Sequence, residues 1–310
     1  MREILTASQL AAEFARRPGL IPVNVDAAGG TVEWLDLQQY HCYHGFFSDS
    51  IAEYHALSRG APYRCASGLE ALDAIDFTEN CIPPSGFIFH AGRCGSTALV
   101  KVLARCRAHV VFGEAAAHNQ IWGALPEHDE DASRLYRKLL LAMGRRRLSS
   151  HRAHIIKFTS YNVMRLEFIR RAFPDTPALF LFRDPGPTLA SWHRGSPGWL
   201  GKDAYVGKVW NRPEAAVEDF FRAALDTDDR RFGLLDHRDL SAETLPAILD
   251  FFGLNVSEAD FRQMASEFAW DSKQVKPAKF VPRSNPVVPV PESLASLYRR
   301  LHSRSLSWRQ

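Results

Sequence analysis

Short apolar runs alternate with longer amphipathic segments through the middle of the chain. The runs cover residues 87–90, 110–112, 154–158 and 178–182, and apolar positions three or four apart mark 96–107, 132–143, 165–172 and a stretch that begins near Pro187. Such runs are typical of buried strands, and such spacing is typical of helices. The alternation predicts a three-layer α/β/α fold with a central, mostly parallel sheet. Ligands of such sheets bind at the carboxyl ends of the strands.

The pattern differs at both ends of the chain. Residues 23–25 and 31–37 look extended, and the Ala-Ala-Gly-Gly sequence at 27–30 predicts a hairpin turn between them. A helix is expected at 49–57, and Pro83-Pro84-Ser85-Gly86 marks a boundary. We therefore expect a small α+β appendage over residues 1–84 and a larger α/β domain over 85–310. The C-terminal third is expected to be mostly helical, with helices at 245–252 and 293–306.

Composition narrows the class of protein. The chain has 310 residues, 46% of them hydrophobic and 24% charged, with a net charge of +3, which excludes a disordered chain and gives no indication of nucleic-acid binding. No apolar run approaches the roughly 18 residues of a transmembrane helix. The five cysteines form no CxxC pair and fit no zinc template, so we expect a cytoplasmic protein without a metal site.

The segment after the first central strand carries the clearest chemical signal. Gly92 and Gly95 let the backbone approach an anion at the start of the next helix, where Ser96 and Thr97 add hydroxyl donors and Arg93 adds a guanidinium. It is not a Walker A motif. That motif has a lysine directly after its last glycine, whereas Ser96 stands here, and His90 occupies the place of its first glycine.

This segment, with its Arg93-Cys94-Gly95-Ser96-Thr97 core, resembles the 5′-phosphosulfate loop of the P-loop sulfotransferases, especially bacterial members. Those enzymes use 3′-phosphoadenosine-5′-phosphosulfate (PAPS) and release the bisphosphate PAP. A second segment resembles their 3′-phosphate motif, in which a serine follows a strand-end arginine by eight residues, as Ser191 follows Arg183. The resemblance covers roughly residues 85–305. It implies that residues Gly92, Arg93, Cys94, Gly95, Ser96 and Thr97 bind the phosphosulfate, and that Arg183 and Ser191 bind the 3′-phosphate.

Arg183 is expected at a strand end and Ser191 about one turn into the following helix, so that both side chains reach one phosphate. The resemblance departs at Ala98, where cytosolic members have an adenine-contacting tryptophan, so the adenine contact stays unassigned.

The catalytic residues are expected at neighbouring strand ends. Arg93 and Lys157 would stabilise charge on the transferring group. Glu114 is the first choice for the base, because protein-tyrosine sulfotransferases have a glutamate at a similar interval after the loop arginine, and a partly dry site would raise its pKa. His118 is the alternative base, since cytosolic sulfotransferases use a histidine. The competing interpretation of His118 is a solvent-facing loop residue.

The resemblance of the two motifs, together with these residues, implies transfer of a sulfuryl group from PAPS to a hydroxyl or amine without a metal. Two alternatives stay open: an ATP-dependent P-loop kinase, and a non-catalytic nucleotide-binding sensor or scaffold. The acceptor, whether a small molecule, glycan, lipid or peptide, is not readable from the sequence, and neither is homo-oligomer formation.

Overall fold

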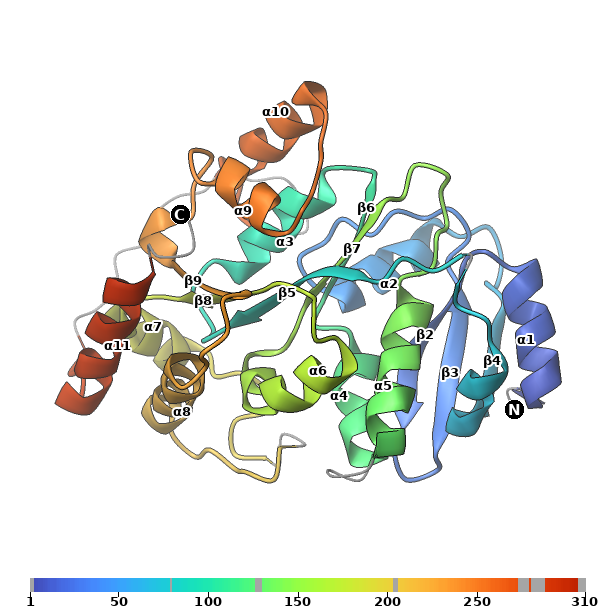
Figure 1. Ribbon diagram of the computed structural model, residues 1–310, viewed down its shortest axis with the longest axis horizontal. Helices are drawn as coiled ribbons and strands as arrows, with labels where there is room; N and C mark the ends of the chain where they lie inside the picture. Colours follow the sequence, from blue (N-terminus) through green and yellow to red (C-terminus); the bar gives the residue numbers. More distant parts are fainter. Residues whose placement is uncertain are drawn as a thin grey trace.

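The computed structural model describes residues 3–78, 80–125, 130–202, 206–272, 279 and 288–305. These residues form two β-sheets, one of four strands and one of five. The four-stranded sheet lies toward the N-terminal helix in Figure 1, and the five-stranded sheet occupies the middle of the molecule. The strands are β1 (Ile4–Leu5), β2 (Leu20–Asp26), β3 (Thr31–Asp36), β4 (Arg64–Gly68), β5 (Pro84–His90), β6 (His109–Gly113), β7 (Ala153–Lys157), β8 (Ala178–Phe182) and β9 (Phe232–Asp236).

The helices fall before, between and after these strands. The α-helices are α1 (Ala7–Arg16), α2 (Phe47–Leu57), α3 (Ser96–Ala104), α4 (Ala116–Gln120), α5 (Glu130–Met143), α6 (Leu166–Ala172), α7 (Pro185–Arg194), α8 (Pro213–Leu225), α9 (Leu245–Phe251), α10 (Glu258–Glu267) and α11 (Glu292–Arg304). Short 3₁₀ helices are η1 (Leu69–Ala74), η2 (Ile121–Gly123), η3 (Ser160–Arg165) and η4 (His237–Asp239).

The five-stranded sheet has the order β6-β7-β5-β8-β9, and each neighbouring pair is parallel. The chain moves from β5 outward to β6, returns through β7, and then crosses to β8 on the other side of β5. The strand order therefore reverses at β5. In open α/β sheets ligands bind outside the carboxyl ends of the strands at such a point. The predicted parallel sheet is confirmed, with β5 at its centre.

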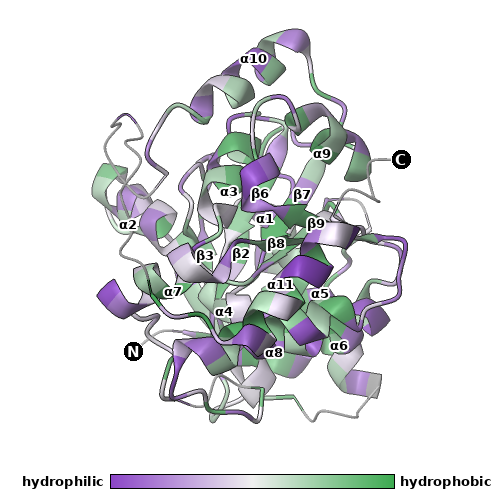
Figure 2. Cartoon of the chain, turned by 90° about the vertical axis from the view of Figure 1, so that its left-hand side faces the viewer, coloured by the Kyte–Doolittle hydropathy of each residue, from purple (hydrophilic) through white to green (hydrophobic). Residues whose placement is uncertain are grey.

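Side chains that alternate along the strands form two separate hydrophobic clusters, one on each face of this sheet. Phe87 and Phe89 point into one cluster together with α5, α6, α8 and α11, while Ile88 between them points into the other with α3, α9 and α10. Figure 2 shows this layering, with α9 and α10 above the strands and α6 and α8 below them. Because both faces are covered, the predicted three-layer architecture is confirmed.

The four-stranded sheet has the order β1-β4-β3-β2 and combines an antiparallel meander with one parallel pair. The predicted hairpin is confirmed, since β2 pairs antiparallel with β3 across the turn at 27–30. The ladder is irregular between Pro22 and Asn24, where one extra residue bulges from β2. Proline suits this edge strand because it has no N–H to donate.

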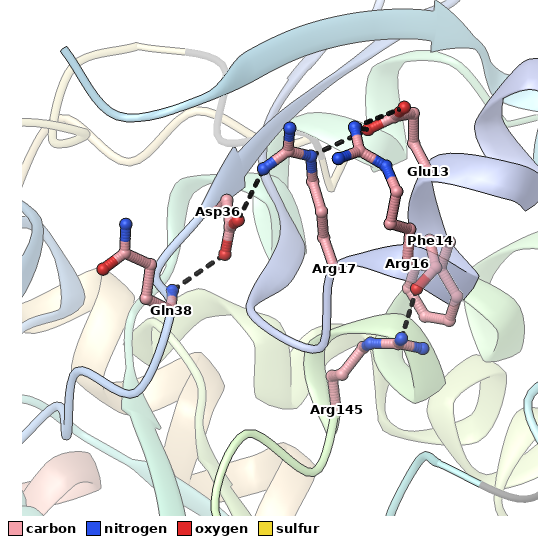
Figure 3. Close-up of polar contacts among 7 residues, drawn as sticks. All are labelled: Glu13, Phe14, Arg16, Arg17, Asp36, Gln38 and Arg145. Carbon is pink, nitrogen blue, oxygen red and sulfur yellow. Dashed lines mark hydrogen bonds and ion pairs between the residues drawn. The ribbon is translucent and has the colours of Figure 1, made fainter.

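The four-stranded sheet is packed tightly onto the rest of the protein. Phe47 of α2 meets Phe112 of β6 edge to face with ring centroids 4.8 Å apart. The buried Arg145, beyond α5, stacks on the ring of Phe14 and donates a hydrogen bond to its carbonyl oxygen. Figure 3 shows this contact beside the Arg17–Asp36 ion pair, which ties α1 to β3. One hydrophobic cluster consequently runs through both parts of the chain. The division at residue 84 stays a prediction.

Several expected boundaries were wrong. The Pro-Pro-Ser-Gly segment does not precede the central strand, since β5 already begins at Pro84. The helix after the phosphate loop ends at Ala104 rather than at residue 107. The C-terminal third contains β9, a short apolar run between charged residues, as well as helices. Gly253 follows the end of α9 with φ of 63°, which is the expected glycine cap.

The described helices include none long and apolar enough to cross a membrane. All five cysteines are buried and unpaired.

Candidate active site

The loop between β5 and α3 has an unusual backbone. Gly92, Arg93 and Gly95 all have positive φ angles, of 81°, 54° and 85°. A Cβ on Gly92 would lie 2.6 Å from Cζ2 of Trp192, and one on Gly95 would lie 2.8 Å from Nδ1 of His237. Both positions therefore require glycine for conformation and for space. The strained Arg93 between them indicates that the surrounding structure holds this loop in one shape.

His90, the last residue of β5, fixes the start of the loop. Its Nδ1 accepts a hydrogen bond of 3.0 Å from the Gly92 N–H, so the ring proton is on Nε2, which donates to the Phe158 carbonyl oxygen at 3.0 Å. Burial and the charge of Lys157 lower the pKa of His90, and the ring is neutral at neutral pH. The residue in place of the first Walker A glycine thus acts as a rigid support for the loop.

Helix α3 begins at Ser96, and its cap residue Gly95 supplies no side-chain hydrogen bond. The N–H groups of the first turn have no intrahelical carbonyl partner, so they favour an anion in front of the helix. Cys94 differs from the other loop residues because its side chain is buried, its thiol donates to the Leu181 carbonyl oxygen, and burial raises its pKa to about 11. Any contribution of Cys94 to binding would therefore come from its backbone.

Basic residues reach this loop from both neighbouring strands. Lys157 ends β7, where the register pairs it with Ile88, and Arg183 follows β8 directly. The Arg183 Nη1 donates to the Arg93 carbonyl oxygen at 3.4 Å, and the Arg93 guanidinium donates to the Gly195 carbonyl oxygen. The structure thus brings Arg93 and Arg183 into contact. It places Lys157 at the end of β7, on the side of β5 opposite to β8.

Glu114 and Lys157 form an ion pair beside the loop. The Lys157 side chain is fully buried and its Nζ contacts the Glu114 Oε1, while the Glu114 side chain is 21% exposed. His90 Nε2 lies 3.4 Å from the same oxygen, and the Glu114 N–H donates to the Lys157 carbonyl oxygen at 2.8 Å. Glu114 itself has a φ of 51°, which is uncommon for this residue type.

The expected rise in the pKa of Glu114 is wrong for this structure. Burial raises the pKa of the carboxyl group, but the charge of Lys157 and the hydrogen bond from His90 together lower it to about 2. Glu114 is therefore ionised at neutral pH. Its role as the base stays a prediction.

His118 is not a solvent-facing loop residue. It lies in α4, fully buried, with its ring edge-on to Phe158 at a centroid distance of 5.7 Å. Neither ring nitrogen has a hydrogen-bond partner within the part of the chain that the structure describes. Burial lowers the pKa of His118 to about 3, so the ring is neutral. This placement gives His118 a packing role in the structure.

Ser191 lies further along α7 than expected. The helix begins at Pro185 rather than near residue 187, so Ser191 follows its first residue by six positions instead of four and lies in the second turn. The Asp184 carboxylate caps the helix by accepting from the Gly186 N–H at 2.8 Å. Ser191 is partly exposed, and no hydrogen bond of its hydroxyl is found among the described residues.

Residues that the sequence did not point to also border the loop. His237, which follows the unpredicted β9, is the neighbour that excludes a side chain at Gly95. From the N-terminal part, Gly45 lies against the Thr97 side chain, and the Phe46 ring lies 4.9 Å from Lys157 Nζ. An apolar run that ends in Asp236-His237 was the available signal for β9. Nothing local to residues 45–46 indicated their contacts.

The described residues include no group of three or more His, Cys, Asp or Glu side chains placed to hold a metal ion.

No protein family model and no curated protein sequence matches the chain. Among solved structures the chain is similar to sulfotransferases. One from Alicyclobacillus acidocaldarius is 15% identical over 73% of this chain and 99% of that chain, with a TM-score of 0.38. STF1 from Mycobacterium tuberculosis H37Rv is 16% identical over 86% of this chain and 94% of that one, with a TM-score of 0.37. The sulfotransferase domain of the curacin biosynthetic pathway is 13% identical over 72% and 98%, with a TM-score of 0.42.

Proposed function

We propose that the protein is a sulfotransferase that transfers a sulfuryl group from PAPS to a hydroxyl or amine. The observation that carries this proposal is the convergence of Arg93, Lys157 and Arg183 on one glycine-rich loop without a Walker lysine. Three cations around an uncapped helix N-terminus suit a donor with several anionic groups. The motif spacing supports the 5′-phosphosulfate at residues 92–97 and the 3′-phosphate at Arg183 and Ser191.

In the proposed reaction the acceptor oxygen or nitrogen forms a bond to sulfur, and the bond between sulfur and the 5′-phosphate oxygen breaks. PAP leaves with the electron pair of the broken bond, and the acceptor proton is released. Lys157 and Arg93 would stabilise the charge that develops on the leaving oxygen. Positioning and electrostatics thereby supply most of the acceleration.

Glu114 is the carboxylate best placed to accept the proton, because it is ionised and one side of it is open. In the free protein Lys157 holds its pKa low. Donor oxygens near Lys157 would share that cation and bring further negative charge close to Glu114. Both effects raise the pKa of a carboxyl group, so donor binding itself would make Glu114 a stronger base.

The donor half of the proposal is tested by thermal unfolding with added nucleotide. PAP is expected to raise the melting temperature, since a ligand at 100 times its Kd stabilises by about 2.7 kcal/mol. Mg-ATP at the same concentration is expected to leave it unchanged. Arg183→Ala should abolish the PAP effect, whereas Arg300→Ala, an exposed arginine on α11, should retain it.

A larger shift with Mg-ATP than with PAP would overturn the proposal and favour a kinase. A PAP shift without release of PAP from PAPS across a broad acceptor set would favour the sensor or scaffold.

A further inference from the structure

A cavity of about 370 Å³ lies between helix α2 and the four-stranded sheet. This volume is in the range of small-molecule sites, at its small end. The strands supply one wall, α2 supplies the opposite wall, and the segment after β6 closes one end. The cavity is lined by Val23, Asn24, Glu33, Phe47, Ser48, Ile51, Ala52, Arg64, Glu114 and Ala116.

Glu114 belongs to this cavity and to the phosphate loop at once. Its carboxylate contacts Lys157 and lies near His90 on the loop side, and the same residue lines the cavity. A molecule in the cavity would therefore lie next to Glu114. A hydroxyl at this end of the cavity would lie beside the carboxylate that is proposed to accept its proton.

The direction of the cavity follows from the order of the strands. Helix α4 packs on β2, where the Gln120 side chain accepts from the Val25 N–H at 2.9 Å, so the Glu114 end is at the β2 edge. Arg64 is on β4, which is separated from β2 by β3. Two strand spacings amount to about 10 Å. Arg64 thus marks the end of the cavity far from Glu114.

The lining defines what an occupant has to offer. Val23, Phe47 and Ile51 provide an apolar middle section for a hydrocarbon body. At the far end the Arg64 Nη2 lies 3.1 Å from Nε2 of His55, whereas its Nε is buried and has no hydrogen-bond partner within the described residues. The Arg64 residue is only partly buried, and the other N–H groups of its guanidinium would pair with a hydrogen-bond-accepting group on the ligand. Glu33 is the other charged residue of this wall and would confine such a group to the Arg64 side.

We propose that this cavity binds the acceptor, and that the acceptor is a compact alcohol or phenol with an apolar body and a hydrogen-bond-accepting group, such as a carboxylate, at the end opposite its hydroxyl. This inference rests on the proposed function. It assigns the appendage a substrate-binding role, with Arg64 as a specificity residue.

The cavity is tested with Ala52→Trp, which places an indole at its α2 wall. Ala56→Trp is the matched control, because Ala56 is exposed on the same helix one turn later and does not line the cavity. The probe is 4-hydroxyphenylpropionate, measured by calorimetry without donor and by transfer from PAPS. Ala52→Trp is expected to weaken binding and raise KM at least about tenfold. Ala56→Trp should match the wild type, and both variants should keep the PAP melting shift.

Arg64 is tested with a pair of ligands. Wild type is expected to bind 4-hydroxyphenylpropionate about tenfold or more tightly than 4-propylphenol, which lacks the carboxylate. Arg64→Gln should remove this preference by weakening only the first ligand. Equal binding of the two by wild type, or an unchanged preference in Arg64→Gln, would overturn the assigned class.

The two proposals fail separately. If PAP does not bind but the phenol binds and Ala52→Trp blocks it, the cavity stands as a binding site and the sulfotransferase proposal falls. If PAPS is turned over but Ala52→Trp leaves binding and KM unchanged, the cavity proposal falls and the function stands.

Discussion

The two sheets of this protein differ in where they place their candidate functional residues. The five-stranded sheet has the neutral His90 and the charged Lys157 and Arg183 at the carboxyl ends of three adjacent parallel strands. The four-stranded sheet instead contributes part of one face to the cavity. The residues that line the cavity from this part of the chain come from three strands and from the helix packed across them. The residues at the carboxyl end of the central sheet each end or follow an apolar run in the sequence. The residues on the cavity-lining face of the four-stranded sheet come close to one another only because their strands pair. Glu114 is where the two regions meet.

Among these predictions, removal of the Lys157 cation beside Glu114 should have the greatest effect. Lys157→Met should slow sulfuryl transfer by about 10²–10³-fold, since the leaving oxygen loses a stabilising charge. It should also lower the free energy of unfolding by about 3 kcal/mol, because the ionised Glu114 keeps no lysine partner.

The double variant Lys157→Met/Glu114→Gln separates these two effects. It should recover much of the stability in urea unfolding without recovering transfer. Recovery of transfer would contradict both the charge-stabilising role of Lys157 and the role of Glu114 as the base.

Acid stability provides the next test of the pair. The pKa of Glu114 falls from 4.5 to about 2 on folding, so its contribution is complete above pH 4.5 and is lost as the pH falls toward 2. Each pKa unit corresponds to 1.36 kcal/mol, which amounts to about 3 kcal/mol over that range. In circular dichroism titrations Glu114→Gln should lose less stability than wild type between pH 5 and pH 2. Glu292→Gln, an exposed carboxylate on α11, should follow wild type.

The phosphate loop can be compared with a turn of the other sheet. Gly92→Ala should lower the free energy of unfolding by about 2–3 kcal/mol, because it combines left-handed strain with a clash against Trp192. Gly30→Ala carries similar strain, with φ of 60°, in open space, and should cost only about 1 kcal/mol. Chemical denaturation measures both variants. Equal costs would mean that the packing of Trp192 yields to the added methyl group.

The smallest expected effect concerns the hydrogen bond that joins the two regions. Gln120→Ala should cost about 1 kcal/mol, the usual net value of one hydrogen bond. Hydrogen exchange should accelerate at the Val25 amide, which loses its acceptor, and should stay unchanged in β8. Faster exchange throughout the central sheet would instead indicate that α4 supports the whole fold.

The central sheet and its donor loop were predictable because their signals are local. Each strand is a short apolar run, and Arg93, Lys157 and Arg183 adjoin such runs, so parallel strands were enough to bring them to one edge. The edge strand β9 escaped prediction because its five residues lie between charged ones and its second residue is glycine. Because β9 was not predicted, the position of His237 beside Gly95 was not predicted either.

Burial and protonation were not predictable in the same way. His118 follows three alanines and was open to interpretation as exposed, but the docking of α4 on β2 buries it. The pKa of Glu114 depends on Lys157, which is 43 residues away in the chain. Both properties arise from contacts between distant segments, and composition or periodicity carries no record of them.

The alternation of strands and helices, the glycine loop and the order of its basic neighbours follow from the amino-acid sequence alone, because periodicity, turn chemistry and strand ends act over a few residues. The packing of the four-stranded sheet beside Glu114, and the cavity that it leaves there, depend on the folded arrangement of the chain. That outcome depends on strand register and on the packing of α2, which join residues from 23 to 116. Desolvation and charge pairing then set the protonation state of each titratable group, and both are properties of the folded chain.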